Sequence, residues 1–174
     1  TKWDSGFTEL WSLEFADSTL VPGSGEIFES NFGSIYVSTI ILGSDEFFVC
    51  KISTSGSLIW QKTYGVSGGF LAAWAFQKAA PGDDGFVFGT GSCSSQNVIV
   101  KCDENGNIEW QKQYSYTSAN AGVTCHGIVN DGNNYIISSG FNINAVLNCT
   151  IDNQGSLLNY SAYTNSNNAM KCKG

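Results

Sequence analysis

The chain has 174 residues, of which 42% are hydrophobic and 13% aromatic, so it can bury a core and is not a disordered segment. Its formal net charge is −7, and its eight Lys and Arg residues are scattered, which argues against nucleic acid as a partner. No apolar run reaches the roughly 18 residues of a membrane-spanning helix, so we expect no membrane insertion.

The chain begins at Thr1 without an initiating Met, and we expect a processed or partial chain. The first predicted element is a strand over residues 7–15, FTELWSLEF, which carries Trp11. It stands alone before the first complete unit of the chain.

The first unit covers residues of about 16–64 and ends on the phrase SLIWQKTYG. Its residues alternate with a period of two, which is typical of β-strands, and Trp60, Lys62 and Tyr64 fall on one strand face. The turn signal TSGS precedes this last strand. We therefore predict four short antiparallel strands for the unit.

The next two units, about 65–114 and 115–163, repeat this pattern. The phrase returns as NIEWQKQYS, and Trp11, Trp60, Trp110 and Asn159 are spaced by 49, 50 and 49 residues. A second phrase also repeats, with Phe86 aligned on Tyr135. The first copy, GSIYVSTIIL, puts Tyr36 in that place. A repeat of this length indicates an array of similar supersecondary units.

The last predicted element is an extra strand over residues 165–174. Its sequence NNAMKCKG, with Met170, is similar to NAGVTCHG at the start of the third unit. The chain thus begins with a strand of the fourth type and ends with a strand of the first type.

The pattern W-Q-K-x-Y-G, D-G-F/Y and V-x-K-x-D-x-x-G-x-I-x-W resembles the tandem β-propeller-like repeats of secreted and cell-surface microbial proteins, from Thr8 to Tyr163. The resemblance implies a scaffold or an interaction surface and no activity. We predict a single all-β domain over 1–174, made of four-stranded antiparallel units of about 50 residues, as a β-propeller-like or open repeat array.

Three units with a strand left over at each end leave three possibilities open. The leftover strands share a sheet and close a propeller, the array stays open and polymerises, or the chain is part of a longer repeat protein. An open array exposes strand edges that accept another chain, and contacts that do not close into a ring produce filaments.

Six cysteines, no C-x-x-C pair and one histidine indicate disulfides in an oxidising compartment more than a zinc site. Two pairs, Cys102 with Cys125 and Cys149 with Cys172, have the same spacing of 23 residues. We predict these two bridges, and Cys50 is left with Cys93. Buried free thiols are the alternative.

Two sequons, at Asn148 and Asn159, predict N-linked glycans and agree with secretion.

Catalysis is not expected. His126 is the single histidine and its repeat equivalents are Gln77 and Lys173, so a polar strand position is the better interpretation. Adjacent carboxylates lie in turn contexts, where Asp bonds its own backbone. The segment from Asp103 to Glu109 lacks the full calcium-loop pattern. We predict no catalytic residue, no metal and no cofactor.

The functional prediction is a secreted structural subunit of an extracellular fibre or surface assembly. Copies of the chain would join by terminal edge-strand addition, with Trp3, Trp11 and Met170 in the assembling segments. The alternative is a secreted adhesin or carbohydrate-binding β-propeller module, with glycans as the ligand. Trp74, in the apolar run LAAWAF, is expected in the core.

Overall fold

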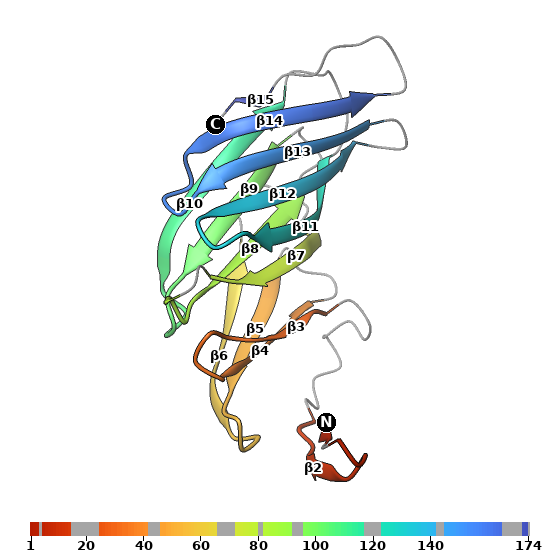
Figure 1. The fold of residues 1–174 in the computed structure, drawn as a ribbon, viewed down its shortest axis with the longest axis vertical. Helices are drawn as coiled ribbons and strands as arrows, with labels where there is room; N and C mark the ends of the chain where they lie inside the picture. Colours follow the sequence, from red (N-terminus) through yellow and green to blue (C-terminus); the bar gives the residue numbers. More distant parts are fainter. Residues whose placement is uncertain are drawn as a thin grey trace.

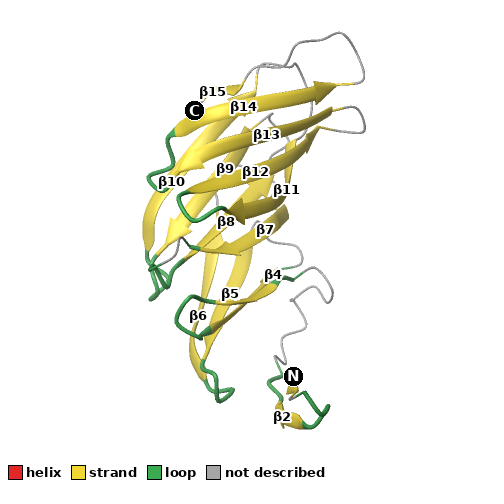
Figure 2. Cartoon of the chain, in the orientation of Figure 1, coloured by secondary structure: helices red, strands yellow, loops and turns green. Residues whose placement is uncertain are grey.

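The structure, a computed structural model, describes residues 1–3, 5–14, 25–41, 46–65, 72–79, 82–91, 96–116, 123–141, 145–164 and 172–173. Every helix or strand in these ranges is a β-strand, which confirms the all-β prediction (Figure 2). No helix of the described residues has the length and apolarity needed to cross a membrane.

The described strands form one small hairpin and three larger antiparallel sheets. The N-terminal hairpin pairs β1 (Lys2–Trp3) with β2 (Glu9–Trp11). The first sheet contains, in order, β3 (Ile27–Glu29), β4 (Ile35–Ile40), β5 (Glu46–Ile52) and β6 (Leu58–Gly65).

The second sheet contains β7 (Ala72–Lys78), β8 (Phe86–Gly91), β9 (Gln96–Cys102) and β10 (Ile108–Tyr116), and its outer edge carries β15 (Cys172–Lys173). The third sheet contains β11 (Val123–Asn130), β12 (Asn134–Phe141), β13 (Ala145–Asp152) and β14 (Leu157–Thr164). Three units of four consecutive strands therefore appear where the repeat predicts them, and the described residues form no closed ring of sheets.

The sheets are stacked face to face, with the N-terminal hairpin and the third sheet at opposite ends (Figure 1). Strand alternation produces a separate core at each interface. In β9, Val98 and Val100 face the first sheet, whereas Ile99, between them, faces the third. A middle sheet buried on both faces accounts for three consecutive apolar residues, 98–100, in β9.

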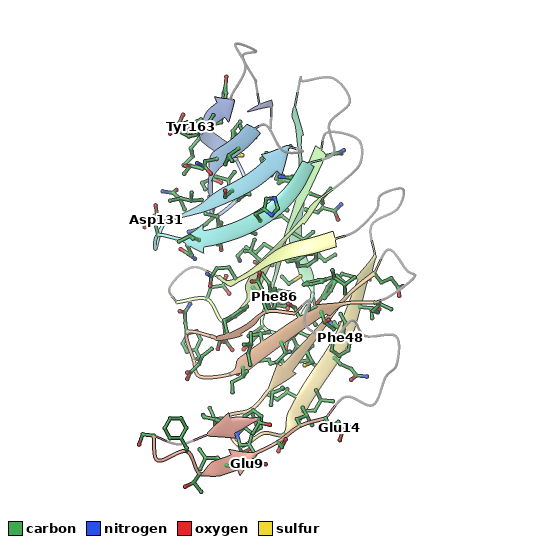
Figure 3. The ribbon with its side chains drawn as sticks, turned by 90° about the vertical axis from the view of Figure 1, so that its right-hand side faces the viewer. Glu9, Glu14, Phe48, Phe86, Asp131 and Tyr163 are labelled. Carbon is green, nitrogen blue, oxygen red and sulfur yellow. The ribbon has the colours of Figure 1, made fainter. Side chains whose placement is uncertain are left out.

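The core between the first two sheets is rich in aromatic rings. Phe86 is fully buried there and contacts Tyr36, Trp60, Tyr64 and Phe76, with ring centroids 5.3 to 6.1 Å apart. Figure 3 shows Phe86 between the two sheets, and Phe48 in the first sheet. Phe48 belongs to the core on the other face of that sheet, where Trp11 and Leu13 cover it.

The predicted alignment of Tyr36 with Phe86 and Tyr135 is wrong by one residue. Phe86 pairs with Cys102 and Tyr135 with Ile151, but Tyr36 pairs with Lys51, and it is Ile35 that pairs with Ile52. A shift of one residue moves a side chain to the other face of a sheet. Tyr36 accordingly faces the next sheet along the chain, and its repeat equivalents are Val87 and Ile136.

The turns between the third and fourth strand of each sheet are built alike. In the second sheet, the N–H of Gly106 donates to the carbonyl of Asp103 at 3.0 Å, and Gly106 has a φ of +72°. The carboxylate of Asp103 accepts the backbone N–H groups of Asn105 and Asn107. These bonds confirm that Asp in this turn bonds its own backbone, and they fix the conformation of the turn.

Candidate functional site

The repeated tryptophans join each sheet to the next. The indole Nε1–H of Trp60 in β6 donates to the carbonyl of Glu104 in the turn of the second sheet, at 3.0 Å. Trp110 makes the same bond to Asn153 in the third sheet at 2.9 Å, and Trp11 makes it to Thr54 in the first at 3.0 Å. We call this contact the tryptophan latch. It occurs in all three turns.

A tyrosine strengthens the latch at two of the three interfaces. The hydroxyl of Tyr64 donates to the carbonyl of Gly106 at 2.8 Å, and that of Tyr114 to Gly155 at 2.7 Å. The turn glycine must lack a side chain, because a Cβ on Gly106 would lie 2.7 Å from the Tyr64 hydroxyl oxygen and 3.1 Å from the Trp60 ring. Burial is the largest of the effects that raise the pKa of Tyr64. The hydroxyl therefore stays protonated and remains a hydrogen-bond donor.

A buried ion pair crosses the first interface beside the latch. Lys51 Nζ lies 2.8 Å from Asp84 Oδ2 of the second sheet, and both side chains are more than nine-tenths buried. The same ammonium donates to the Glu104 carbonyl at 3.3 Å and lies 5.4 Å from the centre of the Tyr36 ring. Tyr36 donates its hydroxyl to the carbonyl of Asp84 at 2.6 Å. Lys51, Tyr36 and one carboxylate oxygen of Asp84 are therefore bound across this interface.

Lys101 is the repeat equivalent of Lys51 but pairs within its own sheet. Its Nζ lies 2.6 Å from Asp83 Oδ2 and also bonds Glu109 Oε2. Burial opposes the charge of Lys101, but the hydrogen bonds to the two carboxylates outweigh it and raise the pKa of this lysine. The sequence signal for both pairs is a lysine at the same place in two strands, with an apolar residue on either side of it.

An open depression of about 450 Å³ lies next to these ion pairs. Its walls combine one aromatic ring with loop carboxylates: Phe32, Gly82, Asp83, Asp84, Asp103 and Glu104. Phe32 is 66% exposed. Asp84 Oδ1 is buried and has no hydrogen-bond partner among the described residues. An exposed ring beside oxygen acceptors is suited to a small polar ligand such as a sugar.

The structure brings the acidic pairs Asp83–Asp84 and Asp103–Glu104 together at this depression, which sequence spacing could not predict. Burial opposes ionisation of Asp103, but hydrogen bonds from Asn107 and Asn105 outweigh it and lower the pKa of this carboxyl. The described residues contain no group of three or more His, Cys, Asp or Glu placed to hold a metal ion. A third pair of adjacent carboxylates in the sequence is Asp45 and Glu46; Asp45 lies outside the described residues and Glu46 begins β5.

The last sheet has a different outer face. Its cross-strand rows on that face are Val129–Ile136–Thr150–Asn159, Gly127–Ser138–Asn148–Ser161 and Gly140–Val146–Tyr163. In the second sheet the matching positions of Thr150 and Asn159 hold Lys101 and Trp110. Tyr163, at the matching position of Tyr114, is 65% exposed and lies near the end of the stack in Figure 3. The predicted glycan sites Asn148 and Asn159 thus lie on one face; their glycosylation stays a prediction.

The outer edges of the second and third sheets also differ. On the second sheet, Cys172 and Lys173 of β15 pair with Tyr116 and Ser115 at the end of β10. On the third sheet, β14 is the edge strand and no described strand pairs with its outer side. Both terminal segments thus include a strand that is paired within the chain.

The predicted bridge between Cys102 and Cys125 is wrong: the structure holds both as buried free thiols. Cys102 belongs to the core between the first and second sheets, and Cys125 to the core between the second and third. The second sheet therefore separates the two sulfurs, and spacing along the repeat could not reveal this.

The other predicted bridges also involve residues outside the description. Cys50 is a buried free thiol, so the structure does not form the predicted bridge from it to Cys93. Cys93 itself lies outside the described residues. Cys149 is buried in the core of the third sheet, and the side chain of Cys172 lies outside the description. The pairing of Cys149 with Cys172 stays a prediction.

The predicted assembly residues have separate places. Trp11 forms the first latch, while Trp3 pairs with Glu9 in the hairpin and its side chain is outside the description, as is that of Trp74. Met170 lies outside the described residues. His126 is exposed at a bulge of β11, and its ring lies over Gly140, where a Cβ would come within 2.5 Å of Nε2.

Comparison with known proteins adds a fold and no activity. No family model matches the chain, and no curated protein matches it. Among solved structures, it is similar to a protein of unknown function from Bacteroides caccae, with 16% sequence identity and a TM-score of 0.50. The match covers 78% of this chain and 44% of that one, so this chain spans less than half of the relative.

Proposed function

We propose that this chain is a non-catalytic structural subunit of an extracellular fibre or surface assembly. It would be built as a β-propeller-like open repeat array, and copies would associate by strand addition. The observation that carries the proposal is the contrast between two equivalent edges: β10 already accepts β15, whereas the outer edge of β14 is unpaired among the described strands. Edge strands with free backbone groups are templates for another strand.

The sequence of β14 favours this use. The strand has eight residues, LLNYSAYT, with no charge and no proline. The equivalent strands β6 and β10 carry Lys62 and Lys112 at the position that Ser161 takes in β14. Charged side chains and proline are the usual protection of an exposed edge, and β14 lacks both.

The strand that is added would come from the C-terminal segment of a second copy. The pairing of β15 with β10 provides the model for this contact, because β10 and β14 are equivalent strands. Both terminal strands are paired within the chain, so either donor would have to leave its place. β15 would leave a pairing of two residues on β10, whereas the N-terminal hairpin is also held to the first sheet by the bond from Trp11 to Thr54, which makes it the poorer candidate. One copy donating to the next is a heterologous contact, and such contacts build filaments when they do not close.

Sedimentation velocity of the purified full-length chain over a range of concentrations, with electron microscopy of the same samples, tests the proposal. We expect concentration-dependent oligomers and filaments. Ser161→Lys, which introduces the residue that β6 and β10 carry, should suppress them, and Asn133→Lys, which adds the same charge in a turn of the same sheet, should not. A chain that stays monomeric throughout contradicts the assembly role.

The open depression supports a second candidate, a carbohydrate-binding module. Phe32 offers a ring face to a sugar, and the carboxylates of Asp83, Asp103 and Glu104 would accept its hydroxyls. Their negative charge favours neutral or amino sugars over acidic ones. A glycan array tests this function. Binding by the wild-type chain that is abolished in Phe32→Ala and kept in Phe7→Ala would favour it; Phe7 is the control because it is 85% exposed in the N-terminal hairpin. Absence of binding by the wild-type chain would exclude it.

A further inference from the structure

The outer face of the third sheet differs from the equivalent faces of the first two in a consistent way. Where the second sheet has Lys101 and Trp110 in one cross-strand row, the third has Thr150 and Asn159. Where the second sheet has the fully buried Ile99, paired with Lys112, the third has Asn148, paired with Ser161. Residues of the latch, of an ion pair and of the packed core have thus been replaced by uncharged polar residues.

These four polar residues form two complete acceptor sequons, Asn148-Cys149-Thr150 and Asn159-Tyr160-Ser161, and the 174-residue sequence contains no third one. Residues two apart on a strand share a face, so each asparagine and its hydroxyl residue point to the same side. The register confirms this, because Thr150 pairs with Asn159 and Asn148 with Ser161. One face of one sheet therefore carries both sequons of the chain.

The face also has room for a sugar. Asn159 is exposed, and its amide oxygen accepts the N–H of Tyr160 at 2.8 Å, which leaves the amide nitrogen without a partner among the described residues. Asn148 is half-buried in a row of small neighbours, Gly127, Ser138 and Ser161. A Cβ added to Gly127 would meet no atom within 4 Å.

We propose that this face is a glycan-bearing end face of the stack, with N-linked sugars on Asn159 and Asn148 in place of a further packed sheet. Each asparagine amide nitrogen forms a bond to the anomeric carbon of an oligosaccharide carried on a lipid diphosphate. The bond from that carbon to the diphosphate breaks, the lipid diphosphate leaves with the electron pair, and the amide proton passes to a base of the membrane transferase. The proposal requires secretion but not the assembly role, because its test reads the mass of the chain and not its oligomeric state.

Secretion of the full-length chain from eukaryotic cells, followed by intact mass before and after peptide-N-glycanase, tests the modification. We expect two releasable glycans, one fewer in Asn148→Gln, one fewer in Asn159→Gln, and none in the double variant. A secreted wild-type chain whose mass the enzyme does not change overturns the proposal, and so does a releasable mass in the double variant.

A matched pair of variants tests why the glycan is tolerated on this face. The test variant, Trp110→Asn with Lys112→Ser, copies the Asn159–Ser161 sequon one repeat earlier, where the third sheet covers the position. The control variant, Trp110→Gln with Lys112→Ser, lacks the sequon. We expect at least a tenfold lower secreted yield for the first variant than for the second. Equal yields with the glycan present at position 110 would show that a covered face accepts it equally well, and would overturn the assignment of an end face.

Discussion

The indole N–H of Trp110 in β10 donates to the backbone carbonyl of Asn153, 2.9 Å away in the turn of the following sheet. Two further tryptophans make the same bond one and two repeats earlier. At each of the three turns, a hydrogen bond therefore runs from the same position of one repeat to the same position of the next. The recurring tryptophan thus connects neighbouring units of the repeat.

Replacement of Trp110 by Phe should weaken this connection. The change keeps a ring but removes the donor of the Asn153 carbonyl, and the expected loss of unfolding free energy is about 1–2 kcal/mol. Urea denaturation measures it. Ile108→Thr, at a 53% exposed position of the same strand, is the control and should change stability by less than about 0.5 kcal/mol. Equal midpoints for Trp110→Phe and wild type would show that the latch contributes no stability.

Gly106 and Gly82 provide a matched comparison of backbone conformation and inter-sheet contact. Both have positive φ, +72° and +90°, so alanine is strained at either position. A Cβ at Gly106 meets Tyr64 and Trp60, whereas at Gly82 it meets nothing within 4 Å. Gly106→Ala should therefore cost about 1–3 kcal/mol more than Gly82→Ala in thermal or urea unfolding. Identical losses would show that the turn is not tightly packed against the preceding sheet.

The ion pair of Lys51 and Asp84 should show strong coupling in a double-mutant cycle. Lys51→Met leaves a buried carboxylate without its cation, and we expect a loss of about 3–5 kcal/mol. Asp84→Asn combined with Lys51→Met removes both charges and should recover most of that loss, because two neutral groups of similar size replace the pair. Additive single and double effects, measured by urea unfolding, would contradict the coupling.

Alkaline pH should destabilise the fold through its buried thiols. Burial raises the pKa of Cys125 to about 12 from an ordinary value of 9.0, and Cys50 and Cys102 behave alike. Because the folded pKa is the higher one, this stability is fully present below pH 9 and is lost as pH rises towards 12. The loss is about 1.4 kcal/mol per pH unit for each thiol in that window. Urea unfolding at pH 8 and pH 10 measures it, and Cys125→Ala should show a shallower dependence; an unchanged slope would argue against burial as the cause.

The repeated phrases of the sequence determined the all-β class, the three units and the position of the strand that carries each tryptophan. Periodicity and turn residues are local properties, and local propensity and pattern agree in strands such as β6 and β10. The sequence also distinguished the last unit, through Asn159 in place of tryptophan, and indicated that Asp103 belongs to a turn.

The tertiary structure decided everything that depends on which face of a sheet a residue occupies and which sheet covers it. Successive side chains of a strand point to opposite faces, so a shift of one residue placed Tyr36 on the face opposite to the one that its alignment predicted. The second sheet also separates Cys102 from Cys125, which belong to the cores on its two faces. Contacts across an interface, such as the pair of Lys51 with Asp84, join residues 33 positions apart, so the local sequence does not identify the partner. The spacing of residues in the sequence reveals the repeat, but only the packing of one sheet on the next determines which residues are in contact.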